Sequence, residues 1–176
     1  MIDWKSGRPA SSSNVRRSSI RVHNILLRAA EELLSSLPSP YTLATITSYI
    51  TRMGGLGIPL NIFLYQEIQR LQRVIQKVRD TLTIMQQAIR GEVVMTSQLV
   101  DAMNDIFNAR VPRPWVFTPG GDEFSWILPT LGLWFASLLE RDMQNRQWLN
   151  SGRPNSYWMT GFFNPQGFLT GMKQEV

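Results

Sequence analysis

The sequence contains no cysteine and only one histidine, His23, among its 176 residues. Without cysteine the chain forms no disulfide and offers no thiolate to zinc or an iron–sulfur cluster. A lone histidine with no other ligand residue at a suitable spacing is typical of a structural or solvent-facing position. No run of about 18 apolar residues occurs, so we expect no transmembrane helix and no membrane partner. The first residues lack an apolar stretch, and we expect no secretory signal there.

Catalytic and cofactor-binding motifs are also missing. The sequence has no GxSxG, HExxH, EF-hand or dinucleotide fingerprint. A glycine-rich loop, Gly54–Gly57, precedes a predicted helix, but it continues into Ile58-Pro59 without the lysine that a phosphate-binding loop needs. We therefore expect a hinge or a tight connection at this loop, and no nucleotide site. The sequence predicts no catalytic residue, no cofactor and no metal ion.

Positive charge exceeds negative charge moderately, with 18 Lys and Arg against 13 Asp and Glu, a net charge of +5 and a pI of about 10.1. Basic residues are dense near the start and scattered elsewhere. Nucleic-acid binders usually gather them on one face. We expect no nucleic-acid partner. Nucleic-acid binding stays as a third hypothesis, which predicts strongly salt-dependent binding.

The most regular pattern lies between Leu60 and Gly91. Apolar residues alternate four and three positions apart, which an α-helix converts into one stripe: Leu64, Ile68, Leu71, Ile75, Val78, Leu82, Met85 and Ile89. Pro59 and a predicted N-cap at Asn61 mark the start, and Gly91 marks the end. The helix would span roughly 45 Å, longer than a small domain of about 30 Å. The stripe either crosses the chain's own core or packs on one large external partner.

The other segments predict a mainly α fold. Residues 1–19 are predicted to be a flexible basic segment, and residues 20–37 and 41–53 to be helices. Thr96 caps a helix that folds back on the long one as a hairpin, and Trp115 fills a core gap or a partner's pocket. A helix over 130–149 has Glu140, Arg141, Asp142 and Arg146 on its wet side. A short strand near the C-terminus, at 157–163, precedes a helix capped by Asn164-Pro165 and a domain truncated at Val176.

Five blocks resemble, in order, the C-terminal domain of dynein heavy chains. They are PLNIFLYQEIQRLQ (59–72), RGEVVMT (90–96), ARVPRPW (109–115), TLGLWF (130–135) and the run 150–175. That run contains GRP, a tryptophan and GFFNPQGFLTGM, where the family has a GFFNPQGFLTAM-type segment. Ordered long blocks are more specific than any short motif. They resemble axonemal heavy chains, with the outer arm as the candidate arm, more than cytoplasmic ones.

The resemblance implies that residues 54–176 are the N-terminal part of that C-terminal domain, and that residues 20–53 match the end of the sixth AAA+ lid. In dyneins the C-terminal domain lies across one face of the AAA+ ring, so the apolar stripe would pack on the ring of the same heavy chain. The protein would be a non-catalytic fragment that supports ciliary movement by the full-length, ATP-driven, minus-end-directed motor. Walker residues and the microtubule-binding stalk would lie upstream of Met1.

The implied partners are the AAA+ ring, other dynein subunits (intermediate or light chains) through the full complex, and microtubules only through the absent stalk. The implied location is the cytoplasm and cytoskeleton, in the axoneme of a cilium or flagellum. Eight motif residues would be structural: Trp158, Gly161, Phe162, Phe163, Asn164, Pro165, Gln166 and Phe168. The alternative is an independent helical adaptor or scaffold that binds a partner helix. Glutamines occupy many positions where a coiled coil would place complementary charges.

Overall fold

The computed structural model describes residues 12–176. These residues form seven α-helices and one short 3₁₀ helix. In sequence order the elements are α1 (Ser12–Ser36), α2 (Leu43–Arg52), α3 (Pro59–Ile89), α4 (Ser97–Phe107), α5 (Arg113–Val116), α6 (Leu131–Ser151), η1 (Met159–Gly161) and α7 (Pro165–Gln174). The prediction of a mainly α fold is confirmed.

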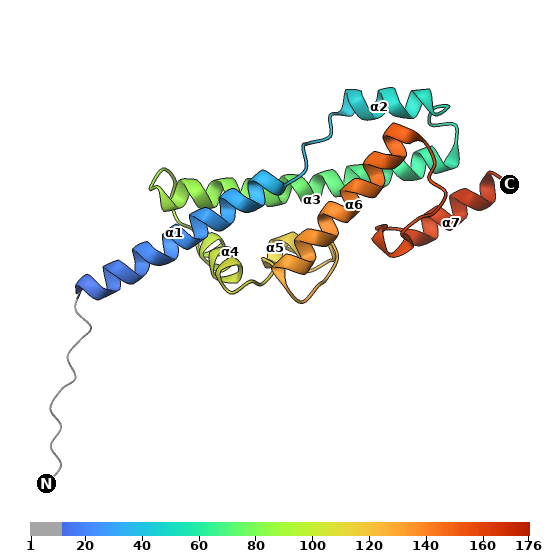
Figure 1. Ribbon diagram of the computed structural model, residues 1–176. Coiled ribbons are helices and arrows are strands. Elements are labelled where there is room, and N and C mark those ends of the chain that lie inside the picture. Colours follow the sequence, from blue (N-terminus) through green and yellow to red (C-terminus); the bar gives the residue numbers. More distant parts are fainter. Residues whose placement is uncertain (1–11) are drawn as a thin grey trace, which may run out of the picture.

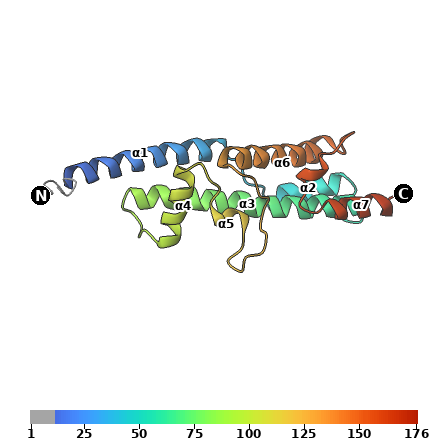
Figure 2. The ribbon, with the colours of Figure 1, turned by 90° about the horizontal axis from the view of Figure 1, so that it is seen from below.

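Helix α3 is the axis on which the other helices pack (Figure 1). Helices α1, α4 and α5 lie along its C-terminal half, whereas α2 and α7 lie along its N-terminal half. Seen from below, α1 and α6 follow one another in one layer, and α3 lies in a second layer (Figure 2). The described part of the protein is therefore elongated along α3, with the α1 start and the C-terminus at opposite ends.

The two ends of α3 differ in how they are capped. Pro59 is at the first helical position after Ile58, and the free N–H of Leu60 donates to the carboxylate of Glu175 at 2.9 Å. The predicted N-cap at Asn61 is wrong, because its amide donates instead to the carbonyls of Met53 and Gly55. At the other end Gly91 has a φ of 79°, the left-handed conformation that favours glycine after a helix.

Several predicted helix starts are confirmed. The side chains of Thr96 and Thr130 accept hydrogen bonds from the N–H groups of Leu99 and Leu133. Asn164 accepts from Gly167 at 3.0 Å. Helix α1 begins earlier than predicted, so residues 12–19 belong to a helix rather than to a flexible segment. The rest of that predicted segment, residues 1–11, lies outside the described residues.

The predicted strand at 157–163 is wrong. This stretch is irregular around η1, and in the described part of the protein β pairing is limited to one bridge between Phe117 and Glu123. A strand needs a neighbouring strand to satisfy its backbone. Here side chains do so instead: the N–H of Trp158 donates to Gln144, and the carbonyl of Gly161 accepts from Arg141.

The apolar core has two parts, which α3 joins. The α1-end core contains Leu26, Ala30, Leu37, Leu71, Val74, Ile75, Val78, Leu82, Met85, Ala88, Leu99, Met103, Ile106, Trp115, Leu131, Trp134, Phe135 and Leu138. The α7-end core contains Ile46, Ile50, Leu60, Phe63, Leu64, Ile68, Trp148, Leu149, Phe162 and Phe168. Trp115 is fully buried, so it fills a gap in the protein's own core.

Candidate functional site

The apolar stripe of α3 lies inside the molecule. Seven of its eight residues have no exposed surface, namely Leu64, Ile68, Leu71, Ile75, Val78, Leu82 and Met85, and Ile89 is half-buried. Other helices of the same molecule cover the stripe on both halves of α3. The expectation that it needs an external packing surface is therefore wrong, and a helix across the protein's own core is the correct interpretation. A partner helix cannot pair with this stripe either.

The eight motif residues form the segment that closes the α7-end core. Phe162 and Phe168 are buried, with ring centroids 4.9 and 5.5 Å from that of Phe63. A Cβ at Gly161 would overlap the ring of Trp158, which lies directly over it. The other members are less buried: Phe163 is half-buried, and Asn164, Pro165 and Gln166 are exposed at the start of α7.

A buried carboxylate holds this segment on α3. Glu67 is 2% exposed and accepts hydrogen bonds from the N–H groups of Phe163 and Asn164 at 2.7 and 3.0 Å. Burial raises the pKa of Glu67, although the two hydrogen bonds and the nearby Arg70 and Arg141 counteract this. Sequence reasoning missed this residue. Its spacing is the signal that could have identified it. Glu67 lies four positions from an apolar residue in each direction along the helix, which places it on the apolar face.

Arg141 of α6 lies near Glu67 at the same segment. Its guanidinium lies 4.2 Å from the ring centroid of Trp126 and 5.3 Å from that of Trp158, and it donates to the carbonyl of Gly161. Burial lowers the pKa of Arg141 to about 10, still well above neutral. The prediction that Arg141 is on the wet side of its helix is wrong, because these neighbours leave it 8% exposed.

A second buried polar group joins α6 to the segment before α2. The hydroxyl of Tyr41 donates to Asp142 at 2.6 Å, and Arg146 donates to the other carboxylate oxygen at 2.7 Å. Burial, and then the charge of Asp142, raise the pKa of Tyr41 far above its usual range. Asp142 is buried too, so its predicted wet position is also wrong. This polar group and the one around Glu67 hold segments of the molecule together.

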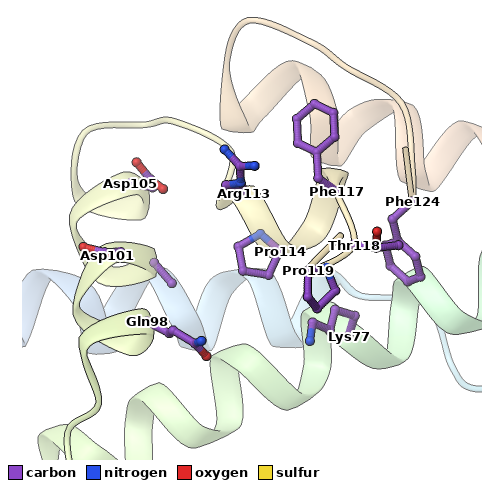
Figure 3. A pocket seen from close by; sticks show the side chains of 11 residues that line it. Lys77, Gln98, Asp101, Asp105, Arg113, Pro114, Phe117, Thr118, Pro119 and Phe124 are labelled. Carbon is purple, nitrogen blue, oxygen red and sulfur yellow. The ribbon is translucent and has the colours of Figure 1, made fainter. Parts of the chain in front are cut away.

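One pocket of about 420 Å³ lies between α3, α4, α5 and the loop after α5 (Figure 3). Pro114 and Pro119 face its centre above Lys77, while Asp101 and Asp105 come from α4. Its two acidic and two basic lining residues balance in charge. The lining residues of this pocket include one hydroxyl side chain, Thr118, and no histidine.

Neither a metal-binding cluster nor a membrane-spanning helix occurs among the described residues. Residues 12–176 hold no group of three or more histidine or acidic side chains that could bind a metal ion. None of the described helices combines the length and apolar character needed to cross a membrane.

The outer side of α6 has an exposed apolar strip, which we call the α6 strip: Leu133, Ala136, Leu139 and Met143. Leu133 and Met143 are 54% and 56% exposed. At 100° per residue the four positions fall within about a third of the helix circumference, so they form one continuous surface. Within residues 12–176, no element buries the two ends of this strip.

Known proteins resemble this chain over nearly all its length. The family model that describes the C-terminal domain of the dynein heavy chain matches residues 4–176. Dynein axonemal heavy chain 8 from Homo sapiens is 47% identical and dynein axonemal heavy chain 5 from Mus musculus is 45% identical, each over 86% of this chain. The dynein gamma chain of the flagellar outer arm from Chlamydomonas reinhardtii is 42% identical over 90% of it. The chain spans about 3% of the length of each relative.

The family match includes residues 20–53 and does not break at residue 54. The predicted relation of residues 20–53 to the sixth AAA+ lid stays a prediction.

Proposed function

The protein belongs to the family of C-terminal domains of dynein heavy chains, and from this membership we propose that it is a non-catalytic part of an axonemal dynein heavy chain that packs on the motor's AAA+ ring. The parent heavy chain would be an ATP-hydrolysing, minus-end-directed motor in the axoneme of a cilium or flagellum. Other dynein subunits would reach this segment through the full complex, and microtubules through the stalk of the parent.

The α6 strip is the observation that carries the packing proposal. Large apolar side chains at more than half exposure, gathered on one helix face, mark a contact surface. The buried stripe of α3 cannot serve, since its side chains already fill the core. The strip therefore replaces the stripe as the proposed ring-packing surface, and Glu140 at its edge would lie at the rim of the contact.

The test uses a heavy chain in which this segment is joined to its AAA+ ring. The double variant Leu133→Glu, Met143→Glu puts two charges into the contact. We expect limited proteolysis to cleave this segment about tenfold faster, because it packs less firmly on the ring. A tenfold change corresponds to about 1.4 kcal/mol of packing free energy. Microtubule gliding should slow as well. The isolated segment should keep its thermal midpoint, because both side chains are exposed.

Val94→Glu is the matched control, because Val94 is 85% exposed on the turn between α3 and α4, away from α6. Met143→Leu keeps the strip apolar and should behave like the parent. If the double variant resists protease and moves microtubules as the parent does, the α6 strip is not the ring contact.

A further inference from the structure

A second pocket, of about 560 Å³, lies beside α6 and is rich in arginine. Arg70 and Arg73 line it from α3, and Arg141 lines it from α6. The remaining walls come from the loop before α6 and from the 160–163 segment. The volume is within the range of about 300–1,000 Å³ that ligand sites occupy. We call it the arginine pocket.

Positive charge in the arginine pocket is not balanced. Glu123 is the one acidic residue among its lining residues, against three arginines. Arg70 and Arg73 are exposed and form no salt bridge within residues 12–176, although Arg70 acts electrostatically on Glu67. Arg141 is held by a carbonyl and by aromatic rings, so its charge is fixed in place. Such a pocket is prepared for an anionic partner.

We propose that the arginine pocket binds an acidic peptide segment of a protein other than the parent heavy chain. Carboxylates suit guanidinium groups because two parallel hydrogen bonds can form between them. Arg70 and Arg73 are three residues apart, so they extend from one side of α3 toward neighbouring points of a peptide. The aromatic walls, Phe124, Trp126 and Phe162, would cover the aliphatic stems of Asp and Glu.

The position of the pocket indicates a partner distinct from the ring, and this step rests on the proposed function. On α6, Arg141 precedes Met143 by two residues, which is about 200° around the helix. Arg141 is about 140° around the helix from Ala136 in the middle of the α6 strip and about 80° from Leu133 at its edge, so the arginine pocket and most of the strip face different directions. If the α6 strip packs on the ring, the arginine pocket stays open to another protein.

The test is fluorescence anisotropy of the isolated protein with a labelled hexaglutamate peptide at low ionic strength. We expect binding that weakens as salt is raised and about tenfold weaker binding by the double variant Arg70→Gln, Arg73→Gln. Arg90→Gln is the matched control, because Arg90 is an exposed arginine at the far end of α3. Hexaglutamine should not bind.

Three results would overturn the proposal. Hexaglutamate that binds the double variant and the parent protein equally is held elsewhere. Inorganic phosphate that displaces the peptide at a matched charge concentration marks a general anion site. Hexaglutamate that does not bind at all leaves the pocket without its proposed partner. The Leu133→Glu, Met143→Glu variant should bind the peptide normally, so failure of ring packing and failure of this proposal can be told apart.

Discussion

The two ends of α3 are closed by different chemistry. At the α1 end, the long helix α1 packs aliphatic side chains on α3, and the core continues over several helical turns, although it also includes Trp115, Trp134 and Phe135. At the α7 end, four rings from distant parts of the sequence, Phe63, Trp148, Phe162 and Phe168, meet in one cluster. Carboxylates then bridge the elements: Glu67 of α3 binds the backbone before α7, and Glu175 after α7 binds the start of α3.

The difference follows from how much each covering element can bury. Helix α1 has 25 residues and offers an apolar face several turns long. Helix α7 has 10 residues and buries only Phe168 and Gly171. So short a helix gains little from apolar burial, and hydrogen bonds to its ends fix its position. Glu175 is further fixed by Arg153 at 2.5 Å.

The largest expected effect is the loss of an aromatic ring at the α7 end. Phe63→Ala should lower the free energy of unfolding by about 3–5 kcal/mol, because it leaves a cavity among three aromatic rings. Urea denaturation measures the loss. Hydrogen exchange should show faster exchange in α2 and α7 than in α1.

Leu82→Ala is the control for this comparison, because Leu82 is fully buried at the α1 end. It should cost about 2–5 kcal/mol and increase exchange in α1 and α4 instead. If both variants increase hydrogen exchange equally in all helices, the two ends unfold as one cooperative unit. The difference in their chemistry would then cause no difference in local stability.

The next effect concerns the carboxylate that holds the motif segment. Glu67→Gln keeps the shape of the side chain, but its single carbonyl oxygen can reach only one of the two N–H groups of Phe163 and Asn164 in the present geometry. One buried donor is then unsatisfied, so we expect a loss of about 1–3 kcal/mol in urea denaturation. Glu140→Gln makes the same change on an exposed site of α6 and should stay within about 0.5 kcal/mol of the parent.

The parent protein and Glu67→Gln also test the raised pKa of Glu67. Because the folded-state pKa is above the unfolded one, the contribution of this group is greatest below the unfolded pKa and is lost as pH rises through the folded pKa. Glutamine does not titrate. The stability difference between the parent and Glu67→Gln should therefore shrink from about pH 4 toward neutral pH. A difference that grows with pH would mean that the hydrogen bonds outweigh burial.

Features set by neighbouring residues were predictable from the sequence. The repeat in α3, the caps at Thr96 and Asn164, the helix start near residue 130 and the end at Gly91 depend on local backbone chemistry, and the structure confirms them. The sequence blocks that resemble the dynein family lie in or next to these same helices.

Features set by distant residues were not predictable. Aromatic residues at 157–163 suggested a strand, but the segment satisfies its backbone on Glu67, Arg141 and Gln144. The wet side of α6 was misjudged because that segment and Tyr41 cover two of its charged residues. The arginine pocket joins α3, α6 and two loops, and no spacing along the sequence shows such a meeting.

The smallest expected effects are on the free energy of unfolding when either of two glycines of α7, which lie close to neighbouring side chains, is replaced. A Cβ at Gly171 would lie 3.1 Å from Cδ2 of Leu60. That methyl group is the end of a side chain and can shift by a few tenths of an ångström. Alanine favours a helix over glycine by up to about 1 kcal/mol, so Gly171→Ala should raise the free energy of unfolding by less than that amount.

Gly167→Ala makes the same change one turn earlier and should have the opposite sign. Its Cβ would collide with the side chain of Asn164, which caps α7, so the variant gains helix propensity but loses the cap. Thermal denaturation of the two variants measures the contrast. If Gly171→Ala also destabilises the protein, the backbone at Leu60 and Pro59, 3.7 Å from the new Cβ, cannot yield, and α7 is held on α3 more rigidly than its short apolar face suggests.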